Sequence, residues 1–129
     1  MKNLTTFVIA IAITTISYAQ VEDVLYSNSN QTCVWSFRLE KWTCKDTVYC
    51  PIKFTLINEV FYLNDKTESK YILHEKGNYE EHEGYSAIFF DNSTDQNNEK
   101  CMFSIFTSLT GSRVIIITYK NYSIEYFII

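Results

Sequence analysis

Basic residues are scarce in this sequence and are nowhere clustered. The 129 residues include 11 Lys and Arg against 15 Asp and Glu, which gives a formal net charge of −4. A chain with this balance has no electrostatic footprint for the phosphates of a nucleic acid or for anionic lipid. We therefore expect neither a nucleic acid nor a membrane surface among its partners.

Residues that commonly perform catalysis are equally few. There are two histidines, His74 and His82, and there is no G-x-S-x-G, H-E-x-x-H or EF-hand pattern. A small secreted hydrolase that uses both histidines with a Lys or Arg is therefore the least favoured of three functions. No catalytic residue is assigned, and no cofactor is implied.

One acidic segment, residues 75–84, contains the densest set of potential metal ligands. These are four consecutive residues: Glu80, Glu81, His82 and Glu83. Oxygen-rich clusters bind hard cations, and His74 could join them. Adjacent residues in a loop do not converge on one point without a scaffold, however, so we expect a solvated acidic loop and no metal site.

The N-terminal segment is nearly free of charge. Lys2 is the only charged residue among the first nineteen, residues 7–16 are apolar residues, Ala and Thr, and Ser17 and Ala19 are small residues at the −3 and −1 positions of a cleavage site. A membrane span needs about twenty apolar residues, so a stable anchor is not expected. Residues 1–19 are predicted to be a signal peptide. Its removal leaves 110 residues with 10 basic and 15 acidic side chains, a net charge of −5.

All four cysteines belong to the expected mature chain: Cys33, Cys44, Cys50 and Cys101. Secretion favours disulfides, and four cysteines allow three pairings. We expect two disulfides and no free thiol, with a weak preference for Cys44–Cys50 and Cys33–Cys101. The C-x-x-C spacings typical of a four-cysteine zinc site are absent.

Three N-glycosylation sequons also follow the leader, at Asn30, Asn92 and Asn121. This is slightly more than chance would give in a chain of this composition. The sequons agree with a eukaryotic secretory route, and they predict a secreted glycoprotein.

Helical periodicity is missing from the mature chain, and proline occurs once, at Pro51. Residues 20–32 are polar and predict a flexible N-terminal arm. Alternating and apolar segments then predict about eight short strands, at residues 33–40, 48–57, 60–63, 70–74, 85–90, 101–109, 113–119 and 122–129. Residues 91–100 predict an exposed loop. The fold class is therefore a single small all-β domain over residues 33–129, mainly antiparallel, either a sandwich or a small barrel.

The last two strands predict their own register. A turn at Lys120-Asn121 pairs apolar residues on one face: Ile117 with Ile124, and Ile115 with Tyr126. The same turn pairs polar residues on the other face: Thr118 with Ser123. We expect the first face to be buried and the second to tolerate charge. Placing Phe103 beside Ile117 requires an odd-length loop with Gly111 in the left-handed region.

Aromatic residues are abundant, with 19 in the mature chain after the loss of Phe7 and Tyr18. Several are expected on inward faces: Trp35, Phe37, Phe54, Phe103 and Tyr126. We expect them to fill the core. The favoured function is a secreted, non-catalytic binding protein with an extracellular protein or glycan partner, and residues 75–84 and 91–100 as the first surfaces to inspect. The alternative is a lipocalin-like carrier of a small hydrophobic ligand, although the Gly-x-Trp signature of that family is absent.

Overall fold

The computed structural model describes residues 24–36, 38–64 and 66–129. The expected signal peptide and residues 20–23 lie outside the described residues. The described residues form ten strands: β1 (Val24–Ser36), β2 (Lys41–Cys44), β3 (Val48–Ile57), β4 (Val60–Leu63), β5 (Lys66–Leu73), β6 (Asn78–His82), β7 (Tyr85–Asp95), β8 (Lys100–Ser108), β9 (Arg113–Thr118) and β10 (Tyr122–Ile128). They contain no helix of the length and hydrophobicity that a membrane span requires.

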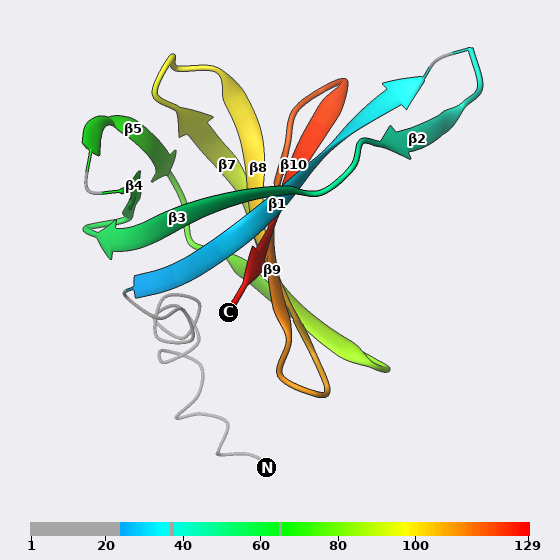
Figure 1. Cartoon of the computed structure of the whole chain (residues 1–129). Coiled ribbons are helices and arrows are strands. Elements are labelled where there is room, and N and C mark those ends of the chain that lie inside the picture. Colours follow the sequence, from blue (N-terminus) through cyan, green and yellow to red (C-terminus); the bar gives the residue numbers. More distant parts are fainter. Residues whose placement is uncertain (1–23, 37, 65) are drawn as a thin grey trace.

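Eight of these strands close into an antiparallel barrel, which confirms the all-β prediction and selects the barrel over the sandwich (Figure 1). The order round the ring is β1, β3, β4, β5, β7, β8, β9 and β10, and the pairing of β10 with β1 closes it. Two strands lie outside the ring, since β2 pairs with β1 and β6 pairs with β7. Full closure leaves no unpaired edge within the ring itself.

The predicted N-terminal arm is wrong from residue 24 onward. Residues 24–30 pair with β3 and residues 27–34 pair with β10, so β1 joins the two sides of the ring. Leu25 and Ser27 are both 2% exposed. A bulge between Ser27 and Ser29 adapts the strand to both neighbours. The polar composition misled the prediction because backbone pairing on both sides, rather than an apolar face, holds residues 27–30.

The two predicted loops are also largely wrong. Residues 78–82 form β6, which pairs with residues 85–89 of β7 through a turn at Gly84, whose φ is +97°. Residues 91–95 belong to β7, and only the short connection before Lys100 leaves the sheet. β5 and β6 follow one another along the same edge of β7. Gly77 joins them where a Cβ would lie 2.7 Å from the side chains of Ile88 and Phe90.

The predicted C-terminal register is confirmed. Ile117 pairs with Ile124 and Thr118 pairs with Ser123, as the turn at residues 120–121 requires. Phe103 lies beside Ile117, and Gly111 has a φ of +94°. One expectation fails, because Ser123 on the outer face is buried rather than solvated.

The barrel interior is filled by aromatic rings that meet across it. Phe61 of β4 stacks on Phe103 of β8 with ring centroids 4.8 Å apart, and Phe54 of β3 meets Tyr126 of β10 edge-on at 5.1 Å. Phe54, Phe61 and Phe103 are fully buried. Trp35 was expected inside but lies on β1 beyond the interior, against Trp42, and Phe37 is outside the described residues.

The structure corrects the predicted cysteine pairing. One disulfide joins Cys33 to Cys44, which are direct partners across β1 and β2. Cys50 and Cys101 are free thiols, the first exposed and the second buried. They cannot pair with one another, because β3 and β8 have three strands between them in either direction round the ring. The same separation excludes a four-cysteine zinc site.

Thiol labelling should reveal this arrangement. We expect one label per native chain, at Cys50, because Cys101 is buried and burial raises its pKa to about 12. Denaturation should raise the count to two, and denaturation with reduction to four. Intact-protein mass spectrometry measures each count. A denatured, unreduced chain that takes up no label would mean that two disulfides form after all.

Candidate functional site

A hairpin arm, described over residues 33–36 and 38–45, extends from the barrel beyond the ring strands (Figure 1). β1 continues past its pairing with β10 and turns back into β2. Cys33 pairs with Cys44 and Trp35 pairs with Trp42, whose rings meet edge-on with centroids 5.7 Å apart. At the turn, the Ser36 hydroxyl accepts a hydrogen bond of 3.1 Å from the backbone N–H of Leu39. The disulfide fixes the base of the arm, and the paired indoles stiffen its middle.

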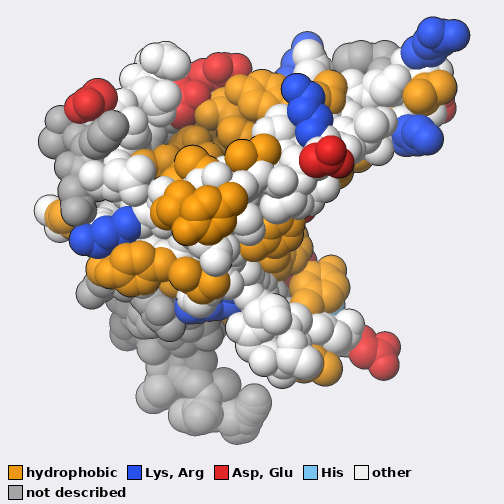
Figure 2. All heavy atoms as spheres, in the orientation of Figure 1, with side chains coloured by type: hydrophobic (Ala, Val, Ile, Leu, Met, Phe, Trp, Pro, Cys, Tyr) orange, Lys and Arg blue, Asp and Glu red, His pale blue; other side chains and the backbone are white. Residues whose placement is uncertain are grey.

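Large apolar side chains are concentrated on the arm and on the start of β3. Of the eleven that are exposed among the described residues, five lie between residues 34 and 49: Val34, Leu39, Trp42, Val48 and Tyr49. Trp42 is 44% exposed and Tyr49 is 76% exposed. Figure 2 shows the arm with Lys and Arg side chains around its tip. The same segment has three basic and two acidic residues, whereas acids dominate the chain as a whole.

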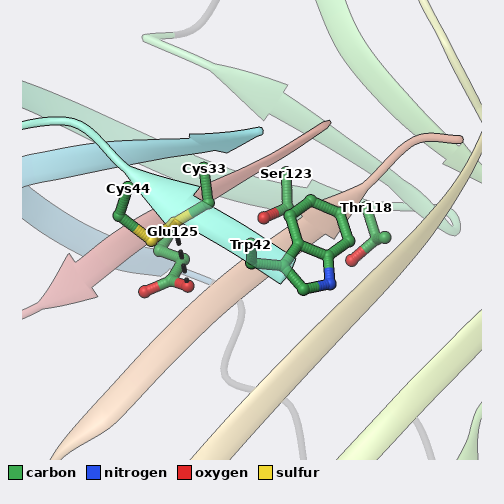
Figure 3. Close-up of a pocket in the computed structure, with 6 residues that line it drawn as sticks. All are labelled: Cys33, Trp42, Cys44, Thr118, Ser123 and Glu125. Atoms are coloured by element: carbon green, nitrogen blue, oxygen red, sulfur yellow. Dashed lines mark hydrogen bonds between the residues drawn. A yellow bond between two sulfur atoms is a disulfide. The ribbon is translucent and has the colours of Figure 1, made fainter. Parts of the chain in front are cut away.

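β2, β1, β10 and β9 pair side by side in this order, so the outward side chains of the arm stand next to those of β9 and β10, and a pocket of about 460 Å³ lies among them (Figure 3). Its lining residues come from both sides: Cys33, Trp42, Cys44, Thr118, Ser123 and Glu125. Ser123 is only 6% exposed although it points away from the barrel interior, because it lies next to Cys33 of the arm and lines this pocket.

Glu125 is the one charged residue that lines this pocket. Its Oε2 lies 3.6 Å from the sulfur of Cys33, the contact drawn as a dashed line in Figure 3. A disulfide sulfur has no proton to donate, so this is a packing contact rather than a hydrogen bond. Within the described part of the chain, Glu125 forms no ion pair.

The same three residues, Cys33, Cys44 and Glu125, place potential metal-ligating atoms within 4.8 Å of one another. The thiolate is the form of cysteine that binds metals, and here the two sulfurs are bonded to each other. The oxidised arm therefore offers a single carboxylate, which does not make a metal site.

A second buried polar cluster lies inside the barrel at the end of β7. Asp95 accepts a hydrogen bond of 2.7 Å from the Tyr119 hydroxyl, and its other oxygen accepts the backbone N–H groups of Asn97 and Glu99 at 2.9 Å each. Burial, and then the hydrogen bond to Asp95, raise the pKa of Tyr119. Burial likewise raises the pKa of the neighbouring Tyr71. All polar groups of Asp95 are engaged, so the cluster ties the β7–β8 turn to β9 and is structural.

The two histidines do not come together. His74 Nε2 lies 2.7 Å from Thr94 Oγ1, whereas His82 Nε2 lies 2.8 Å from Glu80 Oε1 and its ring stacks on Tyr85. Thr94 and Tyr85 are nine residues apart on β7, about 30 Å of extended strand. A hydrolase built on both histidines is therefore wrong.

Strand geometry also separates the potential metal ligands of residues 75–84. Glu80 and His82 share one face of β6, whereas Glu81 lies on the other. Glu83 belongs to the following turn.

The three sequons differ in accessibility. Asn121 is exposed at the β9–β10 turn, where its backbone oxygen accepts the N–H of Trp35 at 2.7 Å. Asn92 is exposed on β7, and its amide donates to Glu75 Oε2 at 3.1 Å. Asn30 is half-buried and pairs with Tyr126, so it shares the inward face of β1.

The arm and its pocket were missed from the sequence, although a signal for the arm is present. Cys33-x-Trp35 and Trp42-x-Cys44 have mirrored spacing, and this places Cys opposite Cys and Trp opposite Trp in an antiparallel hairpin. No comparable pattern marks Ser123 and Glu125. They line a pocket only because the arm pairs beside β10.

The Cys33–Cys44 disulfide is compatible with an extracellular location. Comparison of the chain with protein-family models, with curated protein sequences and with solved structures finds no match in any of the three.

Proposed function

We propose that the mature chain is a secreted, non-catalytic binding protein that engages an extracellular protein through its hairpin arm. The observation that carries the proposal is the concentration of exposed Trp, Tyr and aliphatic side chains on the arm, which a disulfide braces, and on the adjoining start of β3. The N-terminal signal-peptide pattern supports export.

The arm and the adjoining start of β3 have the composition of an interface. Trp, Tyr and Arg are the residue types that dominate binding energy at protein–protein contacts, and residues 34–49 include Trp42, Tyr49 and Arg38. Exposed apolar side chains gathered in one region are also a mark of interaction sites. A protein partner therefore fits the arm better than a glycan.

The rigidity of the arm also supports a binding function. Ordering a flexible loop on binding costs about 0.5–1.5 kcal/mol per immobilised side chain. The Cys33–Cys44 bond and the Trp35–Trp42 contact order the arm before any partner arrives. The filled barrel interior supports an outer binding surface rather than the carrier function.

A binding screen tests the proposal. The biotinylated mature protein is assayed by surface plasmon resonance against recombinant extracellular domains and against immobilised glycans. Trp42→Ala and Tyr49→Ala should each weaken binding to a captured protein at least tenfold, because truncating an interface aromatic removes about 2 kcal/mol or more.

Matched controls lie at the opposite end of the molecule. Tyr79→Ala and Leu109→Ala remove exposed apolar side chains of similar kind from β6 and from the β8–β9 loop, and should change the dissociation constant less than twofold. Binding that depends on these two residues instead of the arm would refute the proposal. So would a screen in which only glycans bind.

A further inference from the structure

The pocket beside the arm contains three oxygen-bearing side chains that form no side-chain hydrogen bond or ion pair with the described residues: Thr118, Ser123 and Glu125. Ser123 is more than nine-tenths buried, so its hydroxyl lines the pocket without open access to solvent. A buried polar group normally has a hydrogen-bonding partner. Each of these three side chains can accept a hydrogen bond from a group that enters the pocket.

The remaining walls are apolar. In Figure 3 the Cys33–Cys44 disulfide stands beside the carboxylate of Glu125, and the indole of Trp42 lies between the hydroxyl groups of Ser123 and Thr118. A volume of about 460 Å³ lies within the range of sites that enclose small ligands or single side chains. The lining therefore combines a π-face with one negative charge.

This combination selects the chemistry of the occupant. An anion would be repelled by Glu125, and an apolar group would leave its carboxylate and two hydroxyls without partners. An ammonium is less suited to the pocket, because it is compact and strongly hydrated. A guanidinium is planar, stacks on an indole, and presents up to five N–H donors in a fork that matches a carboxylate.

We propose that this pocket receives the guanidinium group of an arginine side chain of the partner protein. The inference rests on the proposed function, since it identifies the group that the arm recognises. The plane of the guanidinium stacks on Trp42, two of its N–H groups pair with Glu125, and another donates to Ser123 or Thr118. The described cations of the arm do not occupy this position, because none forms an ion pair with Glu125.

Titration with single amino-acid amides tests the pocket without any partner. ¹⁵N–¹H NMR of the oxidised mature protein follows binding of N-acetyl-arginine amide, of the lysine amide and of the citrulline amide, which has nearly the shape of arginine but no charge. Arginine amide should bind with a millimolar dissociation constant and shift the indole N–H of Trp42. Lysine and citrulline amides should bind at least fivefold more weakly.

Two variants test the assigned roles. Glu125→Gln should weaken arginine amide at least tenfold, and Trp42→Leu, which keeps an apolar wall but removes the π-face, about fivefold. The control Glu80→Gln removes an exposed carboxylate from β6 and should leave binding unchanged. Near-UV circular dichroism and the thiol count verify that each variant is folded and oxidised.

The outcomes separate this proposal from the function on which it rests. Equal binding of arginine and citrulline, equal binding of arginine and lysine, or an unaffected Glu125→Gln variant each overturns the guanidinium assignment, even if a partner binds the arm. Binding of arginine amide that needs Glu125 and Trp42 sustains the assignment, even if the screen of extracellular proteins finds no partner and the proposed function falls.

Discussion

A mature chain in which Ile117 is replaced by aspartate should fail to fold. Ile117 is 0% exposed on β9, between Phe103 of β8 and Ile124 of β10, and no cation is paired with it in the register. An unpaired carboxylate at such a position costs several kcal/mol, even after its pKa rises to keep it neutral. A domain of this size is stable by only about 5–15 kcal/mol. We therefore expect loss of the cooperative thermal transition in near-UV circular dichroism.

The neighbouring residue supplies the control. Thr118 lies on the opposite face of β9 and is half-buried, so Thr118→Asp should keep the transition within a few degrees of the wild type. Ser123→Asp is a poor control, because Ser123 is buried and the new carboxylate would lose its hydration. If Ile117→Asp melts like the wild type while Thr118→Asp does not fold, the assignment of inner and outer faces is wrong.

These strands could be predicted because their sequence satisfies two local rules at once. Alternation assigns each residue to a face, and the turn at residues 120–121 fixes which residues meet. Ile117 and Ile124 then have to be partners, and the odd-length loop around Gly111 extends the register to Phe103. The break between the predicted strands 48–57 and 60–63 is equally local, and the two residues that form this turn, Asn58 and Glu59, both have positive φ.

Segments held by distant partners could not be predicted in this way. Residues 27–30 are Ser-Asn-Ser-Asn and have no apolar face, yet β1 is paired on both sides by strands that lie far away in the sequence. The pairing of the cysteines could not be predicted for the same reason. Cys50 and Cys101 lie on opposite walls of a ring, and no local pattern encodes the order of its strands. The pocket could not be predicted for the same reason, since the arm continues β1 while the other lining residues belong to β9 and β10, far away in the sequence.

The buried tyrosines make the fold sensitive to alkali. Burial raises the pKa of Tyr71, Tyr119 and Tyr126, which are all 6–7% exposed, and it raises the pKa of Cys101 from 9.0 to about 12. In the unfolded chain these groups lose their protons near their ordinary pKa values, whereas in the folded chain they retain them. Their stabilising contribution is therefore complete below about pH 9 and is lost progressively as the pH rises toward the folded-state values.

We expect the free energy of unfolding to fall steeply above pH 10. Each group that stays protonated only in the folded state contributes a slope of about 1.4 kcal/mol per pH unit, so Tyr71, Tyr119 and Cys101 together contribute about 4 kcal/mol per unit, and Tyr126 steepens the slope further. Urea unfolding at pH 8, 9, 10 and 11 measures the slope, in a Cys50→Ser background that removes the exposed thiol and limits disulfide exchange. Tyr71→Phe should reduce the slope by about 1.4 kcal/mol per unit, whereas Tyr49→Phe, at a position 76% exposed, should leave it unchanged. A wild-type stability that stays flat from pH 8 to pH 11 would show that these hydroxyls are not buried together in the folded protein.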